Sequence, residues 1–172
     1  MRLITARLSL RQPELSDAAF LLQLLNDPGF LRFIGDRQVR TLAEAETYLQ
    51  QRILASFETH GFGLWLAERC SDGQVVGLCG LVRRDYLPCP DLGYALLTPY
   101  CGLGYGTELA LAVLAYCANN LQLPGICAIV TPDNQASKQL LQKVGMQWQR
   151  QIQPPDTEEW LDLYQLNLTA SG

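Results

Sequence analysis

The chain has 172 residues, of which 48% are hydrophobic and 17% are charged, and its formal net charge at pH 7 is −4. This length and composition predict a single domain over residues 1–172 with a sizeable core, and the negative charge argues against binding to nucleic acid or to an anionic membrane surface. No apolar run reaches the roughly 18 residues of a membrane span and no signal-peptide pattern begins the sequence, so we expect a cytoplasmic protein.

The six cysteines form no C-x-x-C pair, and the single histidine, His60, cannot supply a metal cluster. Cys79, Cys117 and Cys127 lie in apolar stretches, where a cysteine usually behaves as a small buried hydrophobic residue. We therefore expect reduced cysteines and no metal site.

The N-terminal part predicts a strand and two helices. Residues 2–11 alternate between apolar and polar side chains, as in a half-buried strand. Ser16 is the expected N-cap of a helix that runs to about Asn26, and Asn-Asp-Pro-Gly then breaks it before an irregular segment at residues 30–34. A capping box, Thr-x-x-Glu, opens a second helix over residues 41–59.

A hairpin and a further strand follow. Residues 63–68 and 75–82 are strand-like and flank a Ser-Asp-Gly turn. Gly77 and Gly80 lie inside the second strand, which indicates a bulge or a close backbone approach. Residues 91–97 predict the next strand.

The C-terminal part alternates between helices and strands. Residues 105–119 are apolar almost all round, so this helix should be buried. Residues 126–130 form a continuous apolar run, typical of a central strand. A helix after Asn134 and a final hairpin at residues 147–152 and 159–166 complete the expected order.

Three glycines, Gly102, Gly104 and Gly106, lie where a strand becomes a helix. Free N–H groups and the helix dipole favour an anion at such a turn, and glycine lets the loop close tightly on it. The Gly-Lys-Ser/Thr of a P-loop is absent, and Thr107 stands where a dinucleotide fingerprint needs its third glycine. The pyrophosphate of coenzyme A is a third kind of ligand that such a loop can bind. The alternative is a simple turn that caps a core helix and binds no ligand.

Two motifs together resemble the GNAT-type N-acetyltransferases, in particular the Rim-type branch that modifies ribosomal proteins. Cys101, Gly104 and Gly106 fall on the family's Q/R-x-x-G-x-G/A loop, with cysteine in place of Gln or Arg. Asn134 and Ser137 match the family's Asn-x-x-Ser, and the following helix ends in Lys-x-Gly-Met where the family has Lys-x-Gly-Phe. The similarity extends over essentially the whole chain.

The resemblance implies an α/β (α+β) fold: a single GNAT domain with a mixed, mostly antiparallel sheet of about six to seven strands, splayed in its centre, and about four helices. It also implies transfer of an acetyl group from acetyl-CoA directly to a primary amine, either a protein or peptide N-terminus or a small amine. The alternative is a non-catalytic acyl-CoA-binding or sensing module of the same fold. Homodimers are common among such relatives.

The same resemblance implies the site. The strand before the loop should expose backbone N–H groups to the thioester oxygen, with Tyr94 at its centre, and Ser137 should protonate the departing thiolate. The expected cofactor contacts are Tyr94, Ala95, Leu96, Leu97, Gly102, Leu103, Gly104, Tyr105, Gly106, Thr107, Asn134 and Ser137.

The acceptor pocket and the base are less defined. Phe33 and Ile34 are pocket candidates by resemblance, and Arg83 could contact an acidic acceptor. Plain core packing is the alternative for Phe33 and Ile34, and a solvated loop end is the alternative for Arg83. The base is open among Glu108, Asp91, Glu68, His60 and water. A covalent role for Cys101 is not expected, because transfer in the family is direct.

Overall fold

The computed structural model describes residues 2–168 and contains one eight-stranded sheet in the order β1-β2-β3-β4-β5-β6-β8-β7. Among the strands of these described residues, only the β5–β6 pair is parallel. The strands are β1 (Arg2–Ile4), β2 (Leu8–Arg11), β3 (Leu64–Arg69), β4 (Val75–Val82), β5 (Asp91–Leu96), β6 (Gly125–Val130), β7 (Gln147–Ile152) and β8 (Leu161–Asn167). The expected mixed, mostly antiparallel sheet is confirmed, with one or two strands more than predicted.

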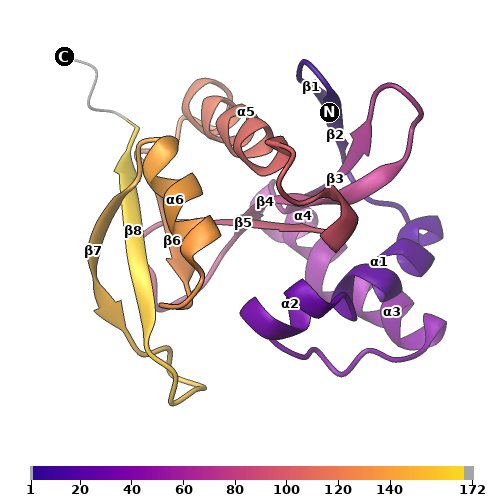
Figure 1. Cartoon of the computed structure of the whole chain (residues 1–172), viewed down its shortest axis with the longest axis horizontal. Coiled ribbons are helices and arrows are strands. Elements are labelled where there is room, and N and C mark those ends of the chain that lie inside the picture. Colours follow the sequence, from indigo (N-terminus) through magenta and orange to yellow (C-terminus); the bar gives the residue numbers. More distant parts are fainter. Residues whose placement is uncertain (1, 169–172) are drawn as a thin grey trace.

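Within residues 2–168, six α-helices and three other helical segments accompany the sheet (Figure 1). The α-helices are α1 (Ala18–Leu25), α2 (Pro28–Phe33), α3 (Leu42–Tyr48), α4 (Ala55–His60), α5 (Tyr105–Asn119) and α6 (Gln135–Lys143). The others are the 3-10 turns η1 (Leu15–Asp17) and η3 (Thr98–Tyr100) and the π-helical segment η2 (Leu49–Leu54), which joins α3 to α4.

The first predicted strand is two strands, β1 and β2, which pair as a hairpin. Thr5 closes the turn between them: its backbone N–H donates to the Leu8 carbonyl at 2.8 Å, and its hydroxyl accepts from the Leu8 N–H at 3.1 Å. A threonine side chain that hydrogen-bonds to the nearby backbone can close a tight turn between two strands in this way. Leu8 and Leu10 are fully buried, as their spacing predicts.

The segment after α1 is also more regular than predicted. Asp27 caps α2 by accepting from the Gly29 N–H at 3.0 Å, and Pro28 occupies the first helical position, so the residues that break one helix start another. The N-cap expected at Ser16 is wrong as well, because Glu14 and Asp17 cap η1 reciprocally. The Thr41 cap on Glu44 is confirmed at 3.1 Å.

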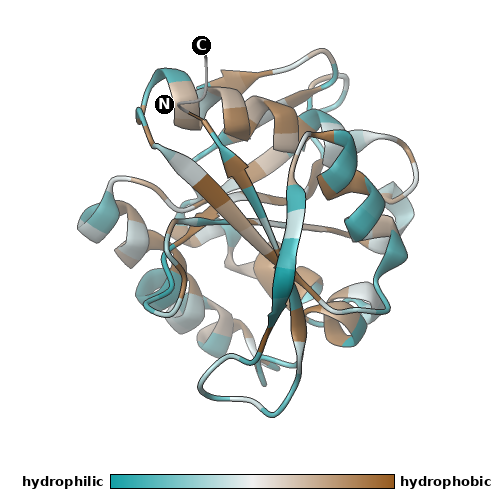
Figure 2. Ribbon diagram, turned by 90° about the vertical axis from the view of Figure 1, so that its left-hand side faces the viewer, coloured by the Kyte–Doolittle hydropathy of each residue, from teal (hydrophilic) through white to brown (hydrophobic). Residues whose placement is uncertain are grey.

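Each face of the sheet has its own core. On one face α5 packs through fully buried side chains such as Leu109 and Val113. On the other, α1 and α3 bury Leu24 and Ala45. The outer strand β7 is almost wholly exposed, and Figure 2 shows it as a largely hydrophilic strand. The predicted burial of the helix at residues 105–119 is thus confirmed along its sheet-facing side.

The sheet splits between β5 and β6. β5 pairs with β4 without interruption from Asp91 to Leu96, but with β6 only at Asp91, opposite Cys127. The splayed centre is therefore confirmed, and it lies between β5 and β6. Gly77 and Gly80 do mark close approaches, because a Cβ on either would collide with a neighbouring backbone carbonyl.

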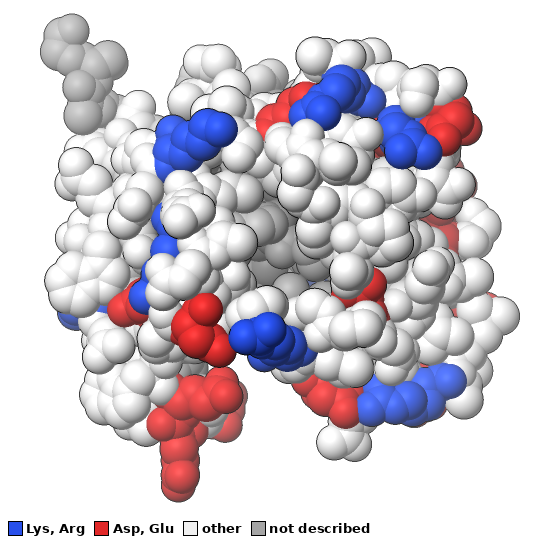
Figure 3. All heavy atoms as spheres, in the orientation of Figure 1, with Lys and Arg blue, Asp and Glu red and all other residues white. Residues whose placement is uncertain are grey.

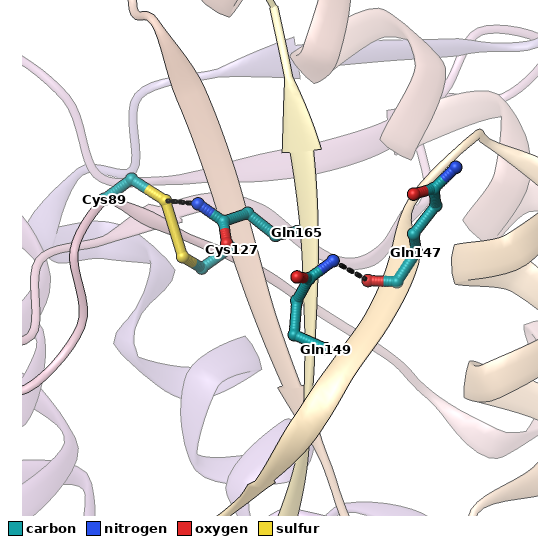
Figure 4. Close-up of a disulfide and its surroundings, with 5 residues drawn as sticks. All are labelled: Cys89, Cys127, Gln147, Gln149 and Gln165. Carbon is teal, nitrogen blue, oxygen red and sulfur yellow. Dashed lines mark hydrogen bonds between the residues drawn. A yellow bond between two sulfur atoms is a disulfide. The ribbon is translucent and has the colours of Figure 1, made fainter.

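A disulfide joins Cys89 to Cys127 at the closed end of this split (Figure 4). The expectation that Cys127 is only a small buried hydrophobic residue is therefore wrong. Cys79 and Cys117 are buried free thiols, as predicted. In the described part of the chain no helix is long and apolar enough to cross a membrane, and no cluster of side chains could hold a metal.

Candidate active site

The loop between β5 and α5 is built for an anion. Gly102 and Gly104 have φ values of +77° and +84°, which only glycine adopts easily. Gly104 is the N-cap of α5, and the first helical bond runs from the Glu108 N–H to the Gly104 carbonyl at 3.2 Å. The N–H groups of Tyr105, Gly106 and Thr107 therefore have no partner inside the helix and carry its positive dipole end.

Gly106 fixes the distance between α5 and α6. A Cβ at this position would lie 2.8 Å from the Leu140 side chain of α6. The third glycine therefore serves helix packing, while Gly102, Leu103 and Gly104 are exposed and could meet a ligand.

Arg7 braces the loop from the N-terminal hairpin. Its Nη1 donates to the Leu103 carbonyl at 2.9 Å, and its guanidinium lies 4.5 Å from the centre of the Tyr105 ring. The sequence near Arg7 gives no signal of this contact, because Leu103 lies 96 residues away in the chain.

The carboxylate of Glu108, a candidate base, accepts hydrogen bonds from residues of the β1–β2 hairpin. Its carboxylate accepts from the Thr5 hydroxyl at 2.5 Å and from the backbone N–H and Nε of Arg7, both at 2.9 Å. Burial acts to raise the pKa of Glu108, but the bonds from Thr5 and Arg7 outweigh it and lower the pKa. A carboxylate held in this way is a poor proton acceptor.

The split exposes two backbone donors of β5. The Leu97 N–H bonds to Val76 of β4, whereas the Pro90 carbonyl accepts from Cys127 of β6. Since successive residues of a strand point their backbone groups to opposite sides, the N–H groups of Tyr94 and Leu96 face β6. The β5–β6 ladder ends before it reaches them.

Tyr94 also reaches the first turn of α6. Its hydroxyl lies 2.6 Å from Ser137 Oγ, and the Ser137 N–H donates to Asn134 Oδ1 at 3.2 Å. Burial raises the pKa of Tyr94 to about 12, although the bond to Ser137 opposes this rise. The structure thus brings together Tyr94, Asn134 and Ser137 from separate parts of the sequence.

The surroundings of Cys101 favour the thiol over the reactive thiolate. Its Sγ lies 3.7 Å from the Leu97 carbonyl oxygen, and burial together with the nearby Asp27 raises the pKa of the thiol. A protonated thiol is unreactive.

The remaining base candidates have other partners. Burial raises the pKa of Asp91 to about 6, although its ion pair with Arg84 at 2.9 Å acts in the opposite direction. Glu68 is paired with Arg11 at 2.7 Å, and His60 stacks on the Phe62 ring. None of these groups is hydrogen-bonded to Tyr94 or Ser137 within the described residues.

The three acceptor-pocket candidates do not lie together. Phe33 ends α2 and Ile34 follows as its C-cap, with 42% of Ile34 exposed. Arg83 follows β4 at the opposite end from the glycine loop and lines a cavity of about 510 Å³ with His60 and Cys89. A second cavity, of about 390 Å³, lies over α3. Neither contains an expected cofactor residue, whereas Figure 3 shows the surface hollowed between the α6–β8 half and the α1–α2 half.

Comparison with known proteins decides the family. The model of the acetyltransferase (GNAT) domain matches residues 7–147. The chain belongs to the GNAT family of acetyltransferases. Its sequence is 30% identical over 154 residues to the uncharacterized protein YkkB of Bacillus subtilis (strain 168), and the alignment covers 88% of each chain.

Solved structures share the GNAT fold. RimL, a ribosomal L7/L12 alpha-N-protein acetyltransferase in complex with coenzyme A, superposes with a TM-score of 0.84 at 16% identity, over 97% of this chain and 98% of that one. The spermidine N-acetyltransferase of Vibrio cholerae, in complex with coenzyme A and spermine, superposes with a TM-score of 0.78 at 16% identity. The superposition covers 94% of this chain and 95% of that one. These likenesses agree with the fold expected from the sequence.

Proposed function

We propose that this GNAT acetyltransferase moves an acetyl group from acetyl-CoA directly to a primary amine. The observation that carries the proposal is the split after Asp91, which leaves the N–H groups of Tyr94 and Leu96 without a partner on β6, on the strand whose Tyr94 hydroxyl contacts Ser137. In an unbroken sheet these N–H groups would be hydrogen-bonded to β6. Leaving them unpaired costs free energy, so a sheet with a purely structural role would not be expected to separate its central strands.

The loop and the split together fit the cofactor. The pyrophosphate would lie on the N–H groups from Gly102 to Thr107, where exposed glycines and the helix dipole favour an anion. The pantetheine arm would follow β5 past Leu97, Leu96 and Ala95, pairing with its open edge. Asn134, already the cap of α6, would border the arm near the sulfur.

The proposed chemistry needs three groups. The amine nitrogen attacks the thioester carbon, and the N–H groups of Tyr94 and Leu96 stabilise the negative oxygen, each donor contributing roughly 10²–10³ in rate. The carbon–sulfur bond then breaks, and Ser137 gives its hydroxyl proton to the thiolate. Because Glu108, Asp91, Glu68 and His60 have other partners, we assign removal of the amine proton to water.

The acceptor class follows from charge and from relatives. The named activities of RimL and of the Vibrio spermidine N-acetyltransferase both concern amines. The net charge of −4 suits a cationic amine. We propose that the acceptor enters the hollow between the α6–β8 and α1–α2 halves, past Phe33 and Ile34. A cytoplasmic location and a homodimer remain predictions.

The test has two steps. The melting temperature is measured with acetyl-CoA, coenzyme A and NAD; at a hundredfold excess over the dissociation constant the true ligand should add about 2.7 kcal/mol of stability. Spermidine and peptides with N-terminal Ser or Ala are then screened for acetylation by mass spectrometry. Binding without turnover of any amine would favour the non-catalytic acyl-CoA-binding module, and stabilisation by NAD alone would refute both readings.

A further inference from the structure

Tyr94 and Ser137 form an isolated pair of hydroxyl groups. Their oxygens lie 2.6 Å apart, and neither oxygen has another hydrogen-bond partner among the described residues. Two hydroxyls carry two protons but need only one for the bond between them. The second proton is therefore available to a third atom, and its location depends on which hydroxyl is the donor.

The chemistry of the two groups favours Tyr94 as the donor. A phenol is a stronger acid than an aliphatic alcohol and therefore the better donor. Tyr94 is also held in its protonated form near neutral pH, because burial raises its pKa to about 12. With Tyr94 donating, Ser137 Oγ is the acceptor, and the serine proton points away from the pair.

The surroundings fix the position of the serine. Its backbone N–H is tied to Asn134, and the next residue, Lys138, forms an ion pair with Asp162 of β8 at 2.9 Å. The first turn of α6 is thereby anchored at both its cap and the neighbouring strand. The remaining freedom of Ser137 is rotation of its hydroxyl, and the bond to Tyr94 restricts that rotation.

We propose that Tyr94 is a positioning residue whose hydroxyl donates to Ser137 and directs the serine proton at the sulfur of the departing thiolate. This inference rests on the proposed function. When the carbon–sulfur bond breaks, its electron pair stays on sulfur, the serine proton moves to sulfur, and the Tyr94 proton moves to the serine oxygen. Water returns to Tyr94 the proton that the amine has lost, so the reaction needs no other proton. Hydrogen bonds in series strengthen one another, which favours such a chain.

The test compares kinetic constants in Tyr94→Phe, Ser137→Ala and the double variant. Tyr94→Phe should lower kcat about 3- to 10-fold, the usual effect of one hydrogen bond, with an unchanged KM for acetyl-CoA. Ser137→Ala should lower kcat further, and the double variant should be no slower than Ser137→Ala. Tyr116→Phe is the matched control, because the Tyr116 ring packs on Trp65 and its hydroxyl bonds to no described residue.

Proton movement gives an independent measurement. In mixtures of light and heavy water, kcat of the wild type should fall along a curve, since two protons move, and kcat of Tyr94→Phe along a straight line. If Tyr94→Phe fails to fold, Tyr94→3-fluorotyrosine keeps the bond but lowers the phenol pKa, and the alkaline limb of the kcat profile should move to lower pH.

The outcomes separate this inference from the function on which it rests. Wild-type kcat in Tyr94→Phe, multiplicative losses in the double variant, or a fluorotyrosine profile that does not move would overturn the role of Tyr94 and leave the acetyltransferase reaction intact. A wild-type protein that binds acetyl-CoA but acetylates no amine would overturn both.

Discussion

Arg7 and Glu108 form an ion pair at 2.9 Å that ties the turn before β2 to the first turn of α5. The same guanidinium holds the Leu103 carbonyl, so one side chain connects the N-terminal hairpin, the glycine loop and the helix that follows it. The loop carbonyl faces Arg7, and the loop is therefore supported on one side while its helix-end N–H groups remain free for a ligand.

Arg7→Ala should weaken the cofactor loop more than the fold. We expect KM for acetyl-CoA to rise about 3- to 10-fold, the effect of losing one or two hydrogen bonds, with a small loss of stability because the side chain is about half exposed. Steady-state kinetics and thermal melting measure the two effects. Arg2→Ala is the control, since Arg2 lies on the same hairpin and only reaches Glu68 at 3.7 Å. Equal KM values in both variants would contradict the bracing role.

Gly102→Asp should abolish high-affinity cofactor binding. Gly102 and Gly73 have almost the same φ, +77° and +72°, and a Cβ at either meets nothing within 4 Å. Gly73→Asp is therefore the control, because it and Gly102→Asp cost a similar backbone strain of about 1–2 kcal/mol. Only Gly102→Asp adds a negative charge to the expected pyrophosphate site, so titration calorimetry with acetyl-CoA should show weaker binding in this variant alone. Similar affinities in the two variants would place the phosphates elsewhere.

The disulfide predicts four free thiols among six cysteines. Under denaturing conditions without reductant, Cys70, Cys79, Cys101 and Cys117 should react with a thiol reagent, and reduction should release two more. Reduction should also lower the free energy of unfolding by up to about 4 kcal/mol, because the bond closes a long loop. Cys70→Ser is the control, as Cys70 is exposed and free. Six reactive thiols without reductant would support the reduced state that the sequence suggests.

Asp91 should make stability fall between about pH 4 and pH 6. Burial raises its pKa from 3.8 to about 6, so the folded state binds more protons than the unfolded state in this window and stability decreases as pH rises. The shift corresponds to about 3 kcal/mol. Asp91→Asn should lack this slope, so the difference in stability between the wild type and the variant should change across this pH window. Parallel curves would mean that Arg84 cancels the effect of burial.

Cys101→Ser should retain acetyl transfer. Burial and the nearby Asp27 raise the pKa of this thiol, its Sγ lies against backbone carbonyls, and a direct transfer needs no covalent enzyme intermediate. Loss of turnover with intact cofactor binding, together with an acetylated cysteine trapped by mass spectrometry in the wild type, would reverse this conclusion.

Local patterns in the sequence predict the elements that short-range interactions specify. The glycine loop, α5 at residues 105–119 and the cap at Thr41 are as expected, and the helix expected after Asn134 is α6, with Asn134 as its N-cap. Each depends on conformational preferences or hydrogen bonds within a few residues. The errors at residues 2–11 and 28–33 arose where Thr5 and Asp27 form local bonds that a search for hydrophobic periodicity overlooks.

Long-range packing decides the site itself. The sequence alone determined that this chain carries a glycine loop before a buried helix and an Asn-x-x-Ser cap on another. Only the tertiary structure shows that the β5–β6 ladder ends at Asp91, sets Tyr94 against Ser137 across 43 residues and joins Cys89 to Cys127. The reason is physical: such contacts form between side chains that the folded sheet and helices bring together, and no residue near either partner in the chain encodes them.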